Sequence, residues 1–273
     1  MRVRGPHSIV AQRALVRQTV RKPREDSGIL MGIPAAKRGF TLIELMIVVT
    51  ILAVIIAVAV PSLIRSRTAA NEGATVGTLR TTATFQAVFK TQIEVDQDGN
   101  GVGEYALLGE LSSELALRPA TNRIASPIYM SQQFNTGGNT GNGVASKCGF
   151  YYRLYLSNAT PGDPYATGTD KELGGNSAIG GSLPDPMAIS RQETAYALYA
   201  WPMELRVTGN RCFFSSQSAE IYFCRMLATT YDNISAAPTA NAAYESGQPV
   251  FRGRIASGAT VGNDNNHWFP AGG

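Results

Sequence analysis

The hydrophobic positions of this chain are concentrated in one run, from Phe40 to Val60. Between Leu45 and Val60 every residue is apolar except Thr50. At roughly 1.5 Å per residue, an α-helix over this run is about 31 Å long, which matches a hydrocarbon core of about 30 Å. No other stretch of the chain is apolar enough to span a bilayer. The pattern therefore predicts one transmembrane helix, with a large domain on one side of the membrane.

After Pro61 the pattern stays helical but becomes amphipathic, which extends the predicted helix over residues 62–95. Apolar and small residues recur at helical spacing on two adjacent faces, with Val76, Leu79, Ala83 and Ala87 on one and Phe85, Phe89 and Ile93 on the other. Pro61 is expected to kink the helix, because it lacks a backbone N–H and its ring clashes with the preceding turn. The helix is expected to end near Val95.

The remaining sequence alternates between short strand-like runs and long stretches rich in Gly, Asn and Ser. Residues Cys148–Leu156 alternate in polarity, which predicts a strand with one buried face. A second strand is predicted over Thr194–Trp201, and a hairpin over Arg211–Phe214 and Glu220–Cys224. A short helix is expected within Tyr105–Leu117, with loops over 120–147 and 157–190. The predicted fold class is α+β, a long N-terminal helix packed on a small antiparallel sheet.

The apolar run contains one carboxylate, Glu44. An acidic residue at the centre of a membrane helix costs about 2.5–3.5 kcal/mol on insertion scales, and less near the end of the span. A charged group in this setting is a functional-site hypothesis that requires a partner. One candidate partner is an α-amino group released by cleavage just before Phe40, which titrates near ~7.7.

The segment Gly39-Phe40-Thr41-Leu42-Ile43-Glu44-Leu45, preceded by Lys37 and Arg38, resembles the processing site of type IV pilins and type II secretion pseudopilins. The resemblance covers about 25 residues and requires glycine, phenylalanine, glutamate and the apolar run in register. It implies cleavage between Gly39 and Phe40 by a membrane-embedded peptidase, followed by N-methylation of Phe40. It further implies that Glu44 pairs with the N-terminal amine of a neighbouring subunit. Pro61 also matches the position of a proline that pilins commonly have.

The resemblance implies a structural, non-enzymatic subunit of a type IV pilus-like filament. Its expected partners are other pilins or copies of itself, the prepilin peptidase and methylase, the inner-membrane assembly machinery and membrane lipid. The expected location is the bacterial inner membrane, single-pass with the N-terminus cytoplasmic, and then a periplasmic or cell-surface filament. Two alternatives remain: a pseudopilin of a type II secretion system, and a single-pass anchor for an exported binding or catalytic domain.

Small residues at Ala69, Gly73 and Gly77 lie four apart and permit close helix packing. Their partner is either the core of a filament or the sheet of the same chain.

These patterns together predict the domain organisation: a cytoplasmic leader at 1–39, a transmembrane and assembly helix at 40–61, its amphipathic continuation at 62–95, an exported α+β domain at 96–256 and a flexible tail at 257–273.

The charge distribution supports this orientation. The chain has a formal net charge of +4, but residues 1–39 hold nine Lys or Arg and two Asp or Glu, and the remainder has a net charge of −3. The basic leader is expected to stay in the cytoplasm by the positive-inside rule. Met31 offers a second start that gives a short basic leader. Since the remainder has no long basic run, there is no clear nucleic-acid signal.

Residues 96–104 match the first half of an EF-hand-type loop, with oxygen ligands at Asp96, Asp98 and Asn100, and Glu104 as a substitute ligand. The alternative is a glycine-rich turn whose side chains bond their own backbone. A calcium ion is the one cofactor that the sequence suggests.

Three cysteines are present, and Cys212 and Cys224 would face each other across the predicted hairpin. Export permits a disulfide, with Cys148 as a competing partner.

Because the two histidines are His7 in the leader and His267 in the tail, a histidine-dependent catalytic site is not expected.

Overall fold

The structure is a computed structural model that describes residues 39–118, 123–134, 143–157, 186–248, 251 and 253–272. The predictions for the leader before Gly39, Met31 included, lie outside the described residues, as do residues 120–122 and 135–142 of the first predicted loop and 158–185 of the second. The chain divides into two compact units at Thr50–Ile51, and each is described by itself.

The described residues form an α+β fold, as the sequence predicts. The helices are α1 (Leu42–Thr91), α2 (Leu108–Leu111) and α3 (Pro186–Gln192), with 3-10 turns η1 (Gln132–Phe134) and η3 (Ile234–Ala236). The strands are β1 (Ala145–Lys147), β2 (Phe150–Leu156), β3 (Tyr196–Pro202), β4 (Cys212–Ser216), β5 (Ile221–Cys224) and β6 (Trp268–Pro270). They form one antiparallel sheet in the order β1-β2-β3-β4-β5-β6.

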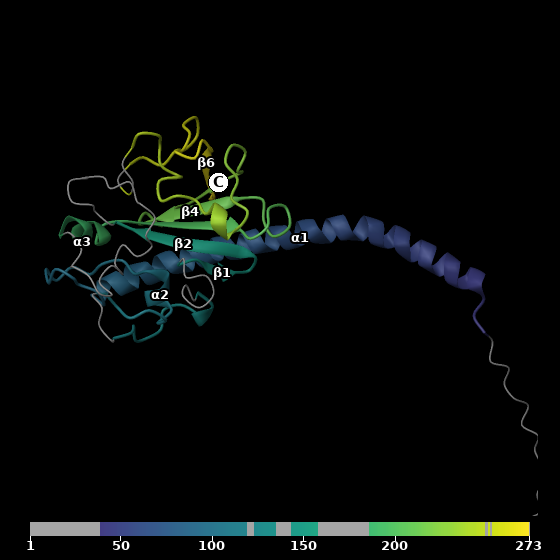
Figure 1. Cartoon of the computed structure of the whole chain (residues 1–273), viewed down its shortest axis with the longest axis horizontal. Coiled ribbons are helices and arrows are strands. Elements are labelled where there is room, and N and C mark those ends of the chain that lie inside the picture. The colour runs from purple at the N-terminus through teal and green to yellow at the C-terminus, as the bar shows by residue number, and fades with distance from the viewer. Residues whose placement is uncertain are drawn as a thin grey trace, which may run out of the picture. The chain divides into compact units, whose positions relative to one another are not determined.

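Helix α1 packs one face of its second half against the sheet (Figure 1). The buried residues of this face are Thr68, Thr75, Thr78, Leu79, Thr82, Gln86 and Phe89. Threonine serves at buried positions because its hydroxyl bonds the carbonyl one turn earlier, as Thr75 does to Asn71 at 2.9 Å. The exposed Gly73 and Gly77 have no neighbour within 4 Å of a built Cβ. The sheet of the same chain therefore does not cover the small-residue stripe.

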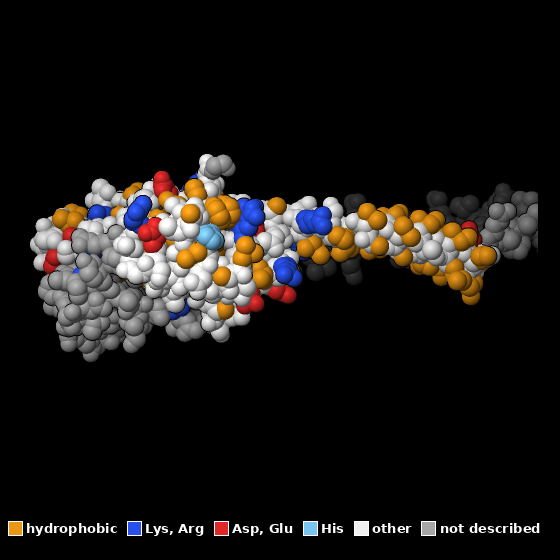
Figure 2. Space-filling model, turned by 90° about the horizontal axis from the view of Figure 1, so that it is seen from above, with side chains coloured by type: hydrophobic (Ala, Val, Ile, Leu, Met, Phe, Trp, Pro, Cys, Tyr) orange, Lys and Arg blue, Asp and Glu red, His pale blue; other side chains and the backbone are white. Residues whose placement is uncertain are grey.

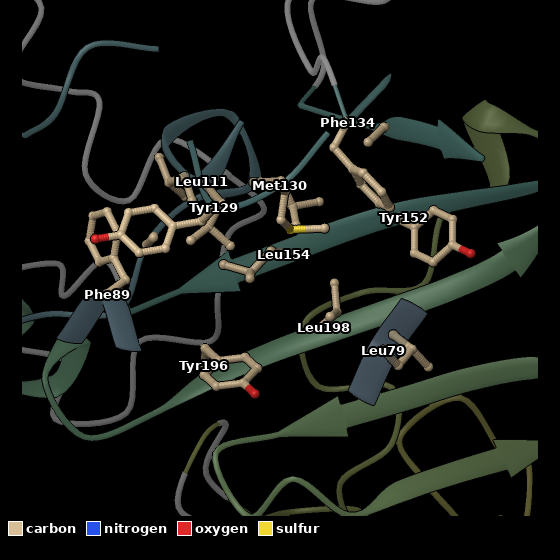
Figure 3. Packing of buried hydrophobic residues seen from close by; sticks show 14 of the residues in the cluster. Leu79, Phe89, Leu111, Tyr129, Met130, Phe134, Tyr152, Leu154, Tyr196 and Leu198 are labelled. Carbon is tan, nitrogen blue, oxygen red and sulfur yellow. The ribbon is translucent and has the colours of Figure 1, made fainter. Parts of the chain in front are cut away.

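Figure 3 shows the core between α1 and the sheet. Leu79 and Phe89 come from α1, and they share one buried cluster with Tyr152, Leu154 and Leu198 of β2 and β3. Phe89 meets the ring of Tyr129 edge-on, with 5.5 Å between the ring centroids. The predicted strand is confirmed over Phe150–Leu156, where Phe150, Tyr152, Leu154 and Leu156 all join this cluster. The prediction of one buried face starting at Cys148 is wrong in part, because Cys148 is exposed before the strand and Tyr155 of the other face is buried in a second cluster.

The opposite face of the sheet is covered by the C-terminal segment (Figure 1). Every residue of β3 is buried, so this central strand has two covered faces. Tyr231 and Trp268 both donate to the carboxylate of Asp264, the first at 2.8 Å, which ties this layer together. The prediction of a flexible tail over 257–273 is wrong for the described residues, because Trp268 is fully buried and β6 pairs with β5.

Other element boundaries also differ from the predictions. Helix α1 ends at Thr91 rather than near Val95, and α2 covers four residues of the predicted Tyr105–Leu117 helix. Strand β1 lies in a stretch expected to be loop. Short elements of this kind are set by tertiary pairing, which local pattern does not report.

Gln86 provides a testable polar contact in the core. It is fully buried, donates to the Ala106 carbonyl at 2.7 Å and accepts from the Ala106 N–H at 2.8 Å. We expect Gln86→Ala to lower the free energy of unfolding by about 1–3 kcal/mol, because both backbone groups lose their partner in a buried site. Thermal unfolding of the detergent-solubilised chain measures this. Gln217→Ala, at an exposed turn, is the control, and an equal midpoint for both variants would contradict the assignment.

The register of the β4–β5 pair places Cys212 opposite Cys224, as predicted. The two residues are direct partners across β4 and β5, and both are buried and not bonded to each other, while Cys148 is exposed. We expect export to an oxidising compartment to link them. Peptide mapping without reductant should find Cys212 bonded to Cys224 and Cys148 free. A Cys148 linkage, or three thiols that all alkylate without reductant, would contradict this expectation.

Candidate functional site

The predicted processing site lies at the start of the described chain. Gly39 and Phe40 are exposed and lie outside regular secondary structure, and the Phe40 side chain is 75% exposed. A Cβ built on Gly39 meets no atom within 4 Å, so this chain's own fold does not require glycine there. Exposed, non-helical peptide bonds are the ones that peptidases reach.

Thr41 begins the helix as its N-cap. Its hydroxyl accepts from the Glu44 N–H at 3.2 Å, and its carbonyl accepts from the Leu45 N–H at 3.2 Å. This places Glu44 at the third helical position, within the first turn, where the helix dipole favours a carboxylate. Sequence reasoning missed Thr41, although the Thr-x-x-Glu spacing is the signal of a capping box.

The Glu44 carboxylate contacts no cation among the residues that the structure describes. Its neighbours along the helix are apolar and exposed, including Ile43 and Met46. Thr50, the other polar residue of the run, satisfies its own hydroxyl by donating to the Met46 carbonyl at 2.7 Å. Glu44 is therefore the polar group of this run that still requires a partner.

The apolar surface continues into the second unit. From Ile51 to Ile64 every large hydrophobic side chain is exposed, and Val58 reaches 75%. Within the described residues, α1 is the helix long and apolar enough to cross a membrane, and none of its most apolar stretch is buried. A helix that is hydrophobic all round requires a cover of lipid or protein.

Pro61 lies inside α1, and helix continues on both sides of it. Since proline has no N–H, the Ala57 carbonyl one turn earlier lacks its usual helical donor. The structure thus places the proline in the apolar, exposed part of α1, before the first buried residue of the helix, Thr68.

The loop over residues 96–104 is closed by its own side chains. The Asp96 carboxylate accepts backbone N–H groups from Gly99, Asn100 and Gly101 at 2.8–3.2 Å. Asp98 accepts from the Asn100 N–H at 3.1 Å. Gly99 and Gly101 have positive φ, which favours glycine. These contacts are those of the self-bonded turn, the alternative to calcium.

The Glu104 carboxylate takes no part in the contacts made by Asp96 and Asp98. This buried carboxylate accepts from the Gln97 N–H at 2.8 Å and lies 3.5 Å from the Arg118 guanidinium, which also bonds Glu110 at 2.9 Å. No group of three His, Cys, Asp or Glu in the described residues is arranged to hold a metal. The predicted use of Glu104 as a calcium ligand is therefore wrong for this structure, because Arg118 and Gln97 hold its carboxylate inside the domain.

Burial raises the pKa of Glu104 above its ordinary value of 4.5, and the charge of Arg118 and the bonds from Gln97 oppose the rise only in part. The folded state therefore holds this proton more tightly than the unfolded state. The resulting stabilisation is complete below the unfolded pKa and is lost as pH rises through the raised folded pKa.

We therefore expect the stability of Glu104→Gln relative to the wild type to increase as pH rises from about 4 to about 7. Thermal midpoints of the two detergent-solubilised proteins across this range measure the difference. Glu204→Gln, at an exposed position, is the control and should show a flat difference. A wild type that gains on the Gln variant as pH rises would mean that the Arg118 pairing outweighs burial.

Comparison with known proteins gives one match, at the N-terminal segment that contains Gly39, Phe40 and Glu44. Residues 34–60 match the family model described as the prokaryotic N-terminal methylation motif, and the structure describes them from Gly39 onward. No curated protein and no solved structure matches the chain. The N-terminal segment that contains Gly39, Phe40 and Glu44 is therefore a prepilin-type methylation signature, of the kind that type IV pilins and pseudopilins share.

Proposed function

We propose that this protein is a structural subunit of a type IV pilus-like filament. It is made as a prepilin, cleaved after Gly39, methylated at Phe40 and assembled through α1. The observation that supports the proposal best is the exposed apolar helix that carries the methylation signature and, near its start, a carboxylate that contacts no cation among the described residues. A bilayer covers the apolar side chains before assembly, and neighbouring helices cover them afterwards.

Cleavage supplies the cation that Glu44 lacks. A new amine at Phe40 is largely protonated near neutral pH, and a cation and an anion in apolar surroundings attract strongly when they pair. Leaving either charge unpaired there is costly. Pairing Glu44 of one copy with the amine of the next therefore favours one axial offset between parallel helices, which is what a helical filament requires.

The exported domain fits a structural role. Two of its polar clusters, the Arg118 network and the Asp264 cluster, are buried and bonded within the fold. His267 is exposed and bonds the Gly258 carbonyl at 3.2 Å. These contacts hold the domain together, and the proposal assigns no catalytic residue.

A type II secretion pseudopilin is the second candidate, because the same signature supports it. Both functions use the same processing and the same helix. Deletion of the gene separates them: loss of surface filaments with normal secretion supports a pilin, and loss of secreted proteins with normal surface filaments supports a pseudopilin.

We expect Glu44→Ala to insert into the membrane at normal or higher levels and to lose most assembly, because the charge that sets the offset is gone. The assay is the amount of filament sheared from cells, or of secretion pseudopilus, against the amount in membranes. Thr50→Ala is the matched control, since Thr50 bonds its own helix, and it should assemble normally. Normal assembly of the Glu44 variant would contradict the proposed role.

A further inference from the structure

The globular unit presents different chemistry at the two ends of its helix. The connection between β3 and β4 lies beside the beginning of the packed part of α1, where Asn71 donates to the Thr208 carbonyl at 3.0 Å. The loop over residues 92–104 follows the end of α1 at Thr91. Asn71 and Thr91 are roughly 30 Å apart along an α-helix. The two loops therefore mark opposite ends of the domain.

The first end is cationic with an apolar centre, and we call it the basic face: Arg206, Arg211, Arg225 and Leu227. Leu227 is 87% exposed, and it lines, with Arg225, two adjacent hollows of about 520 and 530 Å³. Figure 2 shows a surface of the domain on which orange hydrophobic side chains lie beside blue cationic ones and the pale blue histidine.

The arginines of the basic face are not all neutralised. Arg211 pairs with Glu72 at 3.4 Å and lies over the Phe223 ring. Arg206 and Arg225 are exposed and contact no carboxylate among the residues that the structure describes. The β3–β4 connection, residues 203–211, itself contains one acid, the exposed Glu204. Two cations beside an exposed leucine are therefore available to an acidic, partly apolar surface.

The second end has the complementary chemistry, and we call residues 93–102 the acidic loop. Asp96 and Asp98 accept bonds from backbone and amide N–H groups of the loop, and neither contacts a cation in the described part of the chain. Ile93 and Val102 are 44% and 43% exposed at its two ends. Glu94 is already paired with Arg123 at 3.1 Å, so the two aspartates carry the available charge.

We infer that the basic face of one copy receives the acidic loop of another copy of this chain. The inference rests on the proposed filament function, because parallel helices packed with an axial offset bring opposite ends of successive domains together. Such a contact is head-to-tail, so it continues from copy to copy as an open helix when the rotation between copies does not close a ring. Opposite charges fix its register, and the exposed Leu227, Ile93 and Val102 supply apolar area to bury.

Charge reversal with reciprocal rescue tests the contact in the full-length protein in cells. We expect Arg225→Glu and Asp98→Arg each to reduce the amount of sheared filament by about tenfold, because each places like charges together. The double variant should restore assembly toward the wild-type amount. Arg254→Glu, an exposed charge outside both surfaces, is the control and should assemble normally. Thermal midpoints of the detergent-solubilised variants report whether each domain is folded.

The outcomes separate this inference from the proposed function. Normal filaments from both folded single variants would overturn the contact and leave the filament function standing. Folded single variants that lose assembly without rescue in the double variant would also overturn it. Absence of filaments, and of pseudopilus, from the wild type would instead overturn the proposed function. If Arg225→Glu assembles normally but loses retention of duplex DNA that the wild type shows, the basic face serves nucleic acid and the inference is wrong.

Discussion

The structure depends on the requirement that an apolar helix be covered over its whole length. Water cannot solvate the side chains between Phe40 and Ile64, and the domain of this chain covers none of the large ones. The cover must come from lipid or from other proteins. A lone carboxylate in that stretch adds a second requirement, since Glu44 must find a cation in the same surroundings. A filament of parallel helices with cleaved N-termini meets both requirements at once.

The two parts of α1 differ in composition because only the second part packs against the domain. The first part is largely apolar, with Glu44 and Thr50 as the polar residues before Pro61, and its large hydrophobic side chains are exposed in the described structure. From Thr68 onward the buried face consists largely of threonines, together with Gln86 and two large hydrophobic residues. Thr68, Thr75 and Thr82 each donate their hydroxyl to a carbonyl of the helix, and Gln86 satisfies the Ala106 backbone. This face therefore packs against the rest of its own domain. Gly73 and Gly77 lie on a different face of the helix, which the domain does not cover.

The sequence predicted the parts of the fold that have a strong local pattern. The alternation at Phe150 and Tyr152 correctly predicted which face of β2 packs against α1. The hairpin pattern correctly predicted that Cys212 lies opposite Cys224. The methylation signature was recognised because its residues lie close together in the chain. What was missed is non-local: β6 forms because Trp268 fits against the covered face of the sheet, and Glu104 turns inward because Arg118 lies there. Neither partner could be inferred from spacing.

The chemical state of the chain end tests the account most directly. Intact-mass and N-terminal peptide analysis of the protein isolated from cell membranes should find a chain that begins at Phe40 with a methylated amine. That result would show that the cation proposed for Glu44 is made in the cell. A protein that still carries the basic residues before Gly39 joined to the apolar helix would contradict the account.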